Sequence, residues 1–399
     1  GAPQPPWQPP GEVPLGQWVK SVRIQKRDEP LLVRPAPDAK RRGSALVGAR
    51  LPLYAAQRGP GCQGRWLMVG PVAWVCEDRV ELSRQPPLPA ATTPRSHRDG
   101  LPYRYHFAGR YGAFGYGNLS LAEEGIPDAQ LEPGFAVAIE QIADRRPGDP
   151  FGLTTHGVWV PMRDLVPART FLFAGEPVTD GSLDLGWVYT ETAPVYRAAR
   201  GRRVPGEVRT RFEKLDILET VEKGGRRWFR VGERRWVSDR HVRVPRTARL
   251  PATVGPEERW IDVDTSTQIV TAYEGEQPVF ATLASTGKGR GDSIQATPRG
   301  EFRIWVKLRS SDMDNLEDDE ANRLYAIQDV PWVMYFEEGY GLHGTFWHRR
   351  FGRVRSHGCV NLAPLDAQRL FHWAAPRLPA GWSAVLPTRH ELGTLVRVR

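Results

Sequence analysis

Apolar and polar residues alternate most clearly in the C-terminal third of the chain. Three successive runs between residues 260 and 287 place an apolar side chain at about every second position, and short polar or glycine turns separate them. A period of two is typical of β-strands with one buried face. Another strand is predicted at 297–304, after a proline turn. The pattern therefore predicts a meander of short strands.

One segment in this part of the chain has a helical pattern instead. Residues 364–373 carry apolar side chains at the spacing of one helical face, and Pro364 stands at the start. Proline is well tolerated in the first turn of a helix, where its missing N–H has no partner to lose. We expect a short helix that packs its apolar side on the sheet.

A tryptophan-centred pattern occurs three times in the preceding part of the chain. Trp74, Trp159 and Trp236 are each followed by valine and, six positions after the tryptophan, by another apolar residue. Before the first and the last of them, a second alternating segment reaches a turn. This arrangement predicts β-hairpins.

The first and last of these segments resemble bacterial SH3-like domains, which are small β-barrels with a Trp-Val strand near their end. The resemblance covers residues 28–84 and 188–246. Residues 85–180 are predicted to form a linker and a divergent middle module, possibly a third SH3-like domain, and residues 1–27 a proline-rich leader. Proline-rich stretches around 86–94 and 244–251 favour these boundaries.

Composition agrees with many short β segments. The 399 residues include 40 glycines and 36 prolines, which disfavour long uninterrupted helices. No stretch approaches the roughly 20 apolar residues of a membrane-spanning helix. The chain begins with a polar, proline-rich sequence, so we expect a mature form whose export signal or anchor is not part of this sequence.

The formal net charge of +9 suits an anionic partner of any class. The densest basic stretch runs through residues 197–211 and continues at 226–235, with apolar residues interleaved at strand spacing. Two interpretations stay open for this stretch. It is either a solvated face of a sheet or a surface that binds a polyanion.

The chain contains three cysteines, and two of them lie near each other. Cys62 and Cys76 can form a disulfide, which would indicate an oxidising compartment such as the bacterial periplasm. The alternative is a pair of buried free thiols in a cytosolic protein. If the first two pair, Cys359 is left over, and a single free thiol in an exported protein suggests reactivity.

The sequence around this third cysteine has the composition of a nucleophilic site. Residues 343–345 read His-Gly-Thr, and residues 356–361 read Ser-His-Gly-Cys-Val-Asn. A thiol needs a base or a positive neighbour to react near neutral pH, and an adjacent imidazole supplies it. Gly358 allows a tight turn in which backbone N–H groups can point at a developing oxyanion.

Together with a Ser-Thr-Gly-Lys turn at 285–288 and Thr-Pro-x-Gly-Glu-Phe at 297–302, these motifs resemble the YkuD-type L,D-transpeptidase domain over residues 258–388. The resemblance implies a β-sandwich, so the predicted fold class is mainly β, with two or three SH3-like barrels before it. It also implies a reaction. The cysteine attacks the carbonyl of the third residue of a wall tetrapeptide, D-alanine leaves, and an amine of a second stem forms a 3→3 cross-link.

The same resemblance assigns roles to individual residues. Cys359 is the expected nucleophile and His343 the general base. His357 either lies beside the sulfur, since residues i and i+2 of an extended segment share a face, or bonds to the backbone and shapes the turn. The family has asparagine or arginine at the position of Asn361. The residues expected to form the oxyanion site or to hold the loop are Ser356, Gly358, Asn361 and Gly344.

Two further features surround this site in the sequence. Tyr340 and Trp347 bracket His343 and are predicted to wall the substrate groove, with core packing as the alternative. The acidic insert at 311–320 occupies the place of a capping loop, where it could select cationic substrate groups. Calcium binding through Asp312, Asp314 and Asp318 is a rival interpretation, although the spacing differs from that of an EF-hand.

The sequence thus favours a periplasmic transpeptidase that remodels peptidoglycan. Rivals use the same acyl-enzyme with water or a protein amine as acceptor, or are non-catalytic wall-binding scaffolds. Expected partners are peptidoglycan stem peptides and an envelope protein held by the SH3-like modules; no nucleic acid, membrane span, cofactor or metal is expected.

Overall fold

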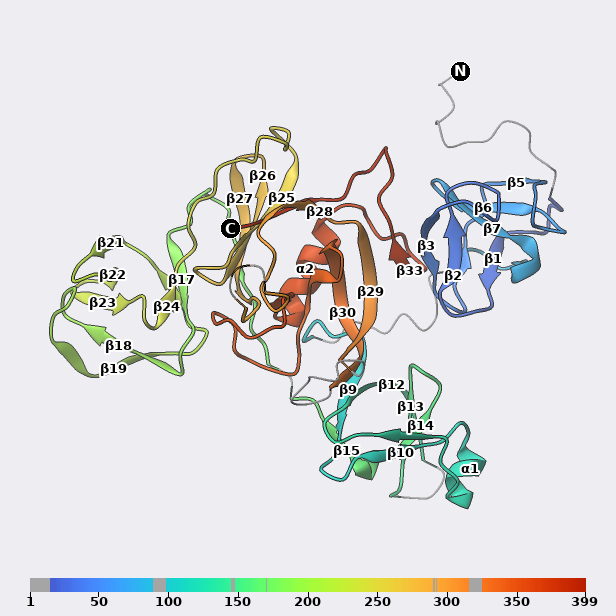
Figure 1. The fold of residues 1–399 in the computed structure, drawn as a ribbon, viewed down its shortest axis with the longest axis horizontal. Coiled ribbons are helices and arrows are strands. Elements are labelled where there is room, and N and C mark those ends of the chain that lie inside the picture. The colour runs from blue at the N-terminus through green and yellow to red at the C-terminus, as the bar shows by residue number, and fades with distance from the viewer. Residues whose placement is uncertain are drawn as a thin grey trace.

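The computed structural model is a mainly β protein in which three small β modules surround a larger C-terminal domain (Figure 1). The structure describes residues 15–88, 98–144, 148–169, 171–289, 291, 293–315 and 325–399. None of the helices in these ranges is long and apolar enough to cross a membrane.

The N-terminal module spans the described residues 15–88. Its first strand lies within the range predicted as a leader, because Val22 and Ile24 alternate with a polar residue, are buried, and pair with the last strand of the module. Cys62 and Cys76 are joined by a disulfide. The elements are β1 (Ser21–Ile24), β2 (Glu29–Leu32), β3 (Arg41–Ala45), β4 (Arg50–Leu51), β5 (Ala55–Gln57), β6 (Trp66–Gly70), β7 (Ala73–Cys76), the 3₁₀ turn Glu77–Arg79 and β8 (Val80–Ser83).

The middle module spans residues 98–168. Its helix α1 has Asn118 as N-cap, whose side chain accepts a hydrogen bond from the Leu121 N–H, and it ends at Gly125 in the left-handed region. The elements are β9 (Arg104–Ala108), β10 (Ala113–Gly115), α1 (Leu119–Glu124), β11 (Ala129–Leu131), β12 (Ala136–Ala143), β13 (Phe151–Thr154), β14 (Trp159–Pro161), the 3₁₀ turn Met162–Asp164 and β15 (Leu165–Pro167).

The third module, residues 183–246, follows a short strand, β16 (Glu176–Pro177), that pairs with the C-terminal domain. Its own core contains the buried side chains of Val195, Phe229 and Val237. The elements are β17 (Leu185–Val188), β18 (Thr192–Tyr196), β19 (Arg203–Thr210), β20 (Lys214–Asp216), β21 (Glu219–Glu222), β22 (Arg227–Gly232), β23 (Arg235–Ser238) and β24 (Val242–Arg243).

The tryptophan hairpins predicted for the first and third modules are confirmed, and the middle module contains the same kind of hairpin. Each tryptophan pairs with the residue six positions before it on the preceding antiparallel strand, and a turn then leads into the next strand. The pairs are Met68 with Trp74, Leu153 with Trp159, and Arg230 with Trp236. The SH3-like classification of these modules stays a prediction.

The C-terminal domain contains the predicted meander and the predicted helix. Helix α2 begins at Pro364 and buries Ala367, Leu370 and Phe371 against the sheet. The elements are β25 (Arg259–Asp264), β26 (Ile269–Glu274), β27 (Gln277–Ser285), β28 (Gly300–Arg303), β29 (Val306–Asp314), β30 (Ala326–Glu337), β31 (Tyr340–Gly344), β32 (Val360–Leu362), α2 (Pro364–Trp373), β33 (Trp382–Val385) and β34 (Leu395–Val398).

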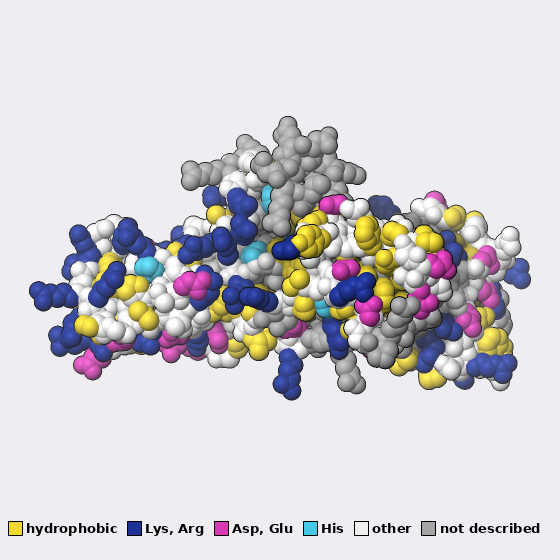
Figure 2. All heavy atoms as spheres, turned by 90° about the horizontal axis from the view of Figure 1, so that it is seen from below, with side chains coloured by type: hydrophobic (Ala, Val, Ile, Leu, Met, Phe, Trp, Pro, Cys, Tyr) yellow, Lys and Arg dark blue, Asp and Glu magenta, His cyan; other side chains and the backbone are white. Residues whose placement is uncertain are grey.

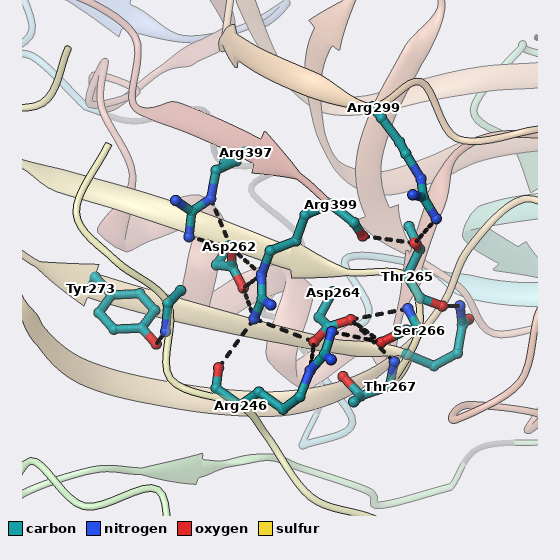
Figure 3. Close-up of polar contacts among 12 residues, drawn as sticks. Arg246, Asp262, Asp264, Thr265, Ser266, Thr267, Tyr273, Arg299, Arg397 and Arg399 are labelled. Carbon is teal, nitrogen blue, oxygen red and sulfur yellow. Dashed lines mark hydrogen bonds and ion pairs between the residues drawn. The ribbon is translucent and has the colours of Figure 1, made fainter. Parts of the chain in front are cut away.

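The domain extends beyond residue 388, where the sequence analysis ended it. Strand β34 lies between β25 and β28 and pairs with both. Ion pairs hold this strand against β25. Arg397 on β34 and Arg399, directly after it, bind the buried carboxylate of Asp262 on β25 (Figure 3). Asp264, two positions further, binds Arg246 of the preceding segment at 2.8 Å, so the same strand also fixes the chain that enters the domain.

Strand β33 joins the N-terminal module to the C-terminal domain. It pairs with β3 on one side and with β29 on the other, as the neighbouring labels in Figure 1 indicate. Trp382 is 2% exposed and belongs to the hydrophobic core of the N-terminal module. Gly43 and Gly70 leave room for its ring, because a Cβ at either position would lie within 3 Å of it.

The other two modules also pack on the C-terminal domain. Phe346 stacks with Tyr105 of the middle module at a centroid distance of 4.1 Å. Phe351 shares a buried cluster with Phe173, which precedes the third module, and with Trp187, which lies within it. The four parts of the chain are therefore connected by hydrophobic contacts as well as by the backbone.

Candidate active site

Two adjacent parallel strands bring the segments of the predicted base and nucleophile next to each other. In the register of β31 and β32, His343 lies opposite Asn361. Cys359 directly precedes β32, and its thiol accepts a backbone hydrogen bond from Gly341, two positions before His343. The parallel pairing thus joins two segments whose candidate residues, His343 and Cys359, are 16 positions apart in the sequence.

The backbone before the nucleophile requires glycine. Gly358 has a φ of +125°, and a Cβ there would lie 2.3 Å from Cε1 of Tyr340. The Tyr340 ring covers this glycine, and its hydroxyl donates to the Ile294 carbonyl at 3.0 Å. Thr297 of the Thr-Pro motif donates to the Gly358 carbonyl at 2.7 Å and accepts from the Gly287 N–H at 2.9 Å. The sequence motifs around 287 and 297 therefore support the nucleophile loop.

Ser356 closes this loop from the other side. Its hydroxyl accepts from the Gly358 N–H at 3.1 Å and donates to the Cys359 carbonyl. Ser356 thus holds the loop through hydrogen bonds between its side chain and the backbone. The Gly358 N–H, predicted as an oxyanion donor, is engaged by this hydroxyl in the structure.

The buried imidazole of His343 is neutral near pH 7. Burial lowers its pKa to about 4, although a hydrogen bond to the Gly344 carbonyl opposes the shift. Because that carbonyl accepts from Nδ1 at 3.2 Å, the ring proton is on Nδ1 and the Nε2 lone pair is free to accept a proton. Trp347 stacks on the ring at a centroid distance of 5.7 Å.

The thiol of Cys359 is half-buried, and burial raises its pKa above the ordinary value despite a backbone hydrogen bond from Gly341. Its Sγ also lies 3.7 Å from the Gly339 carbonyl. With the pKa of the thiol raised and that of His343 lowered, the pair rests as neutral thiol and neutral imidazole instead of an ion pair. Such a pair can transfer its proton as the sulfur attacks.

His357 is exposed, and its ring stacks with Tyr325 at a centroid distance of 6.0 Å. Tyr325 begins the described part of the chain after the acidic insert. The structure therefore associates this histidine with the hairpin formed by β29 and β30. A position beside the sulfur stays a prediction.

Two residues near the site were not singled out by the sequence analysis. His348 contacts Asn361 through Nε2 at 2.9 Å, while its Nδ1 accepts from the Arg350 N–H at 3.1 Å. Burial and nearby arginines lower the pKa of His348 to about 3, so the ring is neutral. The Asn361 atom at this contact is the amide nitrogen Nδ2. The second residue is Tyr335, whose pKa is raised by burial and by the Cys359 charge.

The acidic insert begins as the outer part of the hairpin of β29 and β30. Asp312 accepts from the Asp329 N–H at 2.9 Å and contacts His156 Nε2 at 2.7 Å, which links the hairpin to the middle module. Asp314 lies at the end of β29. Asp318 lies outside the described residues, so the calcium interpretation as a whole stays untested.

Among the described residues, two groups have the spacing to hold a metal ion. In the group of His156, Asp312 and Asp329, the Arg27 guanidinium already lies 3.4 Å from Asp329 and competes with a cation. In the other group, Cys62 and Cys76 are consumed by their disulfide. Neither group includes Cys359 or His343.

The domain that contains this candidate site matches a known family. Residues 258–398 match the family model of YkuD, the L,D-transpeptidase catalytic domain. No curated protein sequence matches the chain. These residues therefore form a YkuD-type L,D-transpeptidase catalytic domain.

Several solved structures are similar to parts of the chain. The catalytic domain of Enterococcus faecium L,D-transpeptidase is 25% identical and aligns over 36% of this chain and 98% of its own, with a TM-score of 0.27. The C442S mutant of the E. faecium enzyme is 22% identical over 36% of this chain and 50% of its own, also with a TM-score of 0.27. L,D-transpeptidase 3 of Mycobacterium tuberculosis is 20% identical over 41% of this chain and 73% of its own, with a TM-score of 0.28.

Proposed function

We propose that the protein is a periplasmic L,D-transpeptidase that forms 3→3 cross-links in peptidoglycan through a Cys359 acyl-enzyme. The observation that carries the proposal is the pairing of β31, which contains His343, with β32, which directly follows Cys359, within a domain that matches the L,D-transpeptidase family model. The Cys62–Cys76 disulfide supports an oxidising compartment.

In the acylation step, the thiol proton moves to Nε2 of His343 as the sulfur bonds to the carbonyl carbon of the third stem residue. The carbonyl electrons form an oxyanion, for which the Cys359 N–H is the proposed donor. When the oxyanion collapses, the bond to D-alanine breaks, and the leaving amine takes the proton from His343. The product is a thioester on Cys359.

In the second step, the side-chain amine of another stem attacks the thioester. His343 Nε2 takes a proton from this amine as the new amide forms, and the departing sulfur regains it. The neutral resting state of His343 suits both steps, because its pKa of about 4 leaves Nε2 available at neutral pH. A water molecule in place of the amine would give a tripeptide instead.

Supporting roles follow from the contacts around the pair. Trp347 holds the imidazole ring by stacking, and Tyr340 holds the loop at Gly358; we propose that both also line the substrate groove. Asn361, bonded to His348, fixes the start of β32. His357 is proposed to contact substrate or sulfur from its exposed position in the loop.

The three preceding modules, at residues 15–88, 98–168 and 183–246, would hold wall polymer or an envelope protein near the catalytic domain. Their contacts with residues 258–398 support a fixed spatial relation between binding and chemistry. The acidic insert at 311–320 is proposed as the cap over the groove, and the contact of His357 with Tyr325, which follows the insert in the sequence, supports this proposal.

The test is incubation of the purified protein with disaccharide-tetrapeptide, with products followed by mass spectrometry. Cys359→Ala removes the proposed nucleophile, His343→Gln removes the base, and His390→Ala, at an exposed histidine, is the matched control. We expect 3→3 dimers that depend on Cys359 and His343 and not on His390. Tripeptide alone would establish a carboxypeptidase, and the absence of any Cys359-dependent product would favour a protein acceptor or a scaffold.

A further inference from the structure

Most of the net charge of the chain lies in the third module. Residues 183–246 contain 16 Lys and Arg and 9 Asp and Glu, a net charge of +7, compared with +9 for the whole chain. Figure 2 shows Lys and Arg side chains over the end of the molecule that this module forms and onward toward the middle. Such a local excess attracts anions, and its field acts over roughly 8 Å at physiological salt.

Part of this charge is neutralised within the module. Glutamates bind several of its arginines, which fits the interpretation of these positions as a solvated sheet face. The pairs are Arg211 with Glu191 at 2.7 Å, Arg230 with Glu219 at 2.8 Å, and Arg235 with Glu207 at 2.6 Å. These arginines leave little charge for an external partner.

Three other arginines gather without a carboxylate. Arg203, Arg240 and Arg353 are exposed, and among the described side chains none of the three has an acidic group within 4.0 Å. Tyr189 connects two of them, because its hydroxyl donates to the Arg240 carbonyl at 2.7 Å and the Arg353 guanidinium lies over its ring. Burial and the charges of all three arginines lower the pKa of His241. We name these three residues the arginine cluster. Like charges held together without a counter-charge favour an anionic ligand.

The arginine cluster is built on fixed aromatic residues. Two guanidinium groups lie over the ring of Tyr189, Arg243 at 4.1 Å and Arg353 at 5.3 Å from the ring centroid. Arg243 also donates to the Gly352 carbonyl at 3.0 Å. This hydrogen bond connects the third module to the loop that carries Arg353. Arg203 lies 5.9 Å from the ring of Tyr196. Arginine stacked on an aromatic ring keeps its outer N–H donors free for a carboxylate.

The cluster is continuous with the catalytic loop. Arg353 lies six positions before Cys359, in the loop that is hydrogen-bonded to the third module. The exposed Arg355 lies two positions after Arg353. A polymer bound at the arginine cluster would therefore lie along the chain that leads to the nucleophile. The substrate of the proposed reaction carries the complementary charge, since a tetrapeptide stem ends in a free carboxylate.

We propose that the arginine cluster binds the carboxylates of stem peptides on polymeric peptidoglycan and holds the polymer beside the nucleophile loop. This inference rests on the proposed function, because it takes its ligand from the substrate of that reaction. It assigns to the third module a carboxylate-binding surface, shared with the loop before Cys359.

The test compares Arg203→Ala/Arg240→Ala with Arg58→Ala/Arg104→Ala, which removes two exposed arginines from the other modules. Both leave Arg353 and the catalytic loop unchanged. Binding to purified insoluble peptidoglycan is measured by co-sedimentation over a range of NaCl, and turnover of soluble disaccharide-tetrapeptide is measured in parallel.

We expect the cluster variant to bind the polymer about fivefold more weakly, since two exposed ionic contacts each contribute roughly 0.5 kcal/mol. It should also show a smaller salt dependence, bind amidated peptidoglycan no worse than the wild type does, and keep its turnover of the soluble substrate. The control should bind as the wild type. Equal binding by both variants, or undiminished wild-type binding to amidated polymer, would overturn the inference. Absence of soluble turnover in the wild type would contradict the proposed function alone, because binding is measured separately.

Discussion

At the scale of single residues, the site contains a thiol with a raised pKa and an imidazole with a lowered pKa. A reactive thiolate–imidazolium pair would need the opposite shifts. Burial raises the pKa of Cys359 and lowers that of His343 to about 4. A thiol with a raised pKa is mostly protonated near neutral pH and is therefore a weak nucleophile there.

The first prediction concerns the reactivity of this thiol with pH. Alkylation of Cys359 by iodoacetamide should be slower at pH 7 than that of a free cysteine and should rise with pH through a pKa above the ordinary value. The acid limb of kcat/KM should fall near pH 4, where His343 becomes protonated and can no longer accept a proton. Rate measurements by mass spectrometry from pH 4 to 10 check both limbs. Fast alkylation at pH 6 would indicate a thiolate–imidazolium pair and contradict this prediction.

The second prediction concerns the glycine before the nucleophile. Gly358→Ala should lower kcat/KM about 100-fold or more, because a Cβ at 2.3 Å from Tyr340 displaces the loop by enough to misplace the sulfur. Gly339→Ala is the matched control, since a Cβ there meets nothing within 4 Å. Steady-state kinetics and thermal unfolding of both variants separate misplacement from loss of folding. Equal activity of the two variants would refute the requirement for glycine.

At the scale of elements, strand pairing places the charges that hold the C-terminal domain together. Asp262 and Asp264 point from β25 toward Arg397 and Arg399 on β34 and toward Arg246 before the domain (Figure 3). Burial works against ionisation of Asp264, but hydrogen bonds from Arg246 and Ser266 outweigh it and lower the pKa to about 2. The carboxylate therefore stabilises the domain while it is ionised.

The third prediction follows from this shift. The folded pKa of Asp264 is below the ordinary 3.8, so its contribution to stability is present above pH 3.8 and is lost as the pH falls through about 2. Asp264→Asn should lower the free energy of unfolding by about 2 kcal/mol at pH 7 and by much less near pH 2. Urea unfolding at both pH values checks it, with the exposed Asp216→Asn as control. An equal loss at both pH values would show that the charge is not responsible.

Elements with a strong local pattern could be predicted from the sequence. Pro364 and one apolar face sufficed for α2, and alternation sufficed for the meander and the tryptophan hairpins. The same alternation is present in β1 and β34. However, β1 lies within the predicted leader and β34 lies after residue 388, where the domain was predicted to end, and the partners of both strands are far away in the sequence. No sequence motif indicates the contact of His348 with Asn361, because this contact depends on the register between the loop and β32.

At the scale of the whole molecule, the family match at 258–398 does not coincide with a physical boundary. Trp382, within that segment, lies in the core of the N-terminal module, and β33 continues the sheet of β3 into β29. Pairing of β29 with β30, of β30 with β31, and of β31 with β32 extends this connection to the strand that follows Cys359. No local pattern in the sequence could indicate a core shared across more than 300 positions.

The fourth prediction tests this shared core. Trp382→Ala should cost about 3 to 5 kcal/mol, as expected for a fully buried tryptophan, and should increase proteolysis of the N-terminal module as well as of the C-terminal domain. Trp18→Ala, at a tryptophan 46% exposed in the same module, is the control. Thermal unfolding combined with limited proteolysis measures both effects. Destabilisation confined to residues 258–398 would show that the two parts do not share a core.

The position of Trp382 also determines when the protein can finish folding. A growing chain exposes its N-terminal module first, yet that module lacks one of its largest core side chains until residue 382, about 300 positions later, has been made. Residues 15–88 therefore stay incompletely packed until the segment that carries Trp382 is present. A truncation that removed residue 382, even one that spared Cys359, would leave the first module without this side chain.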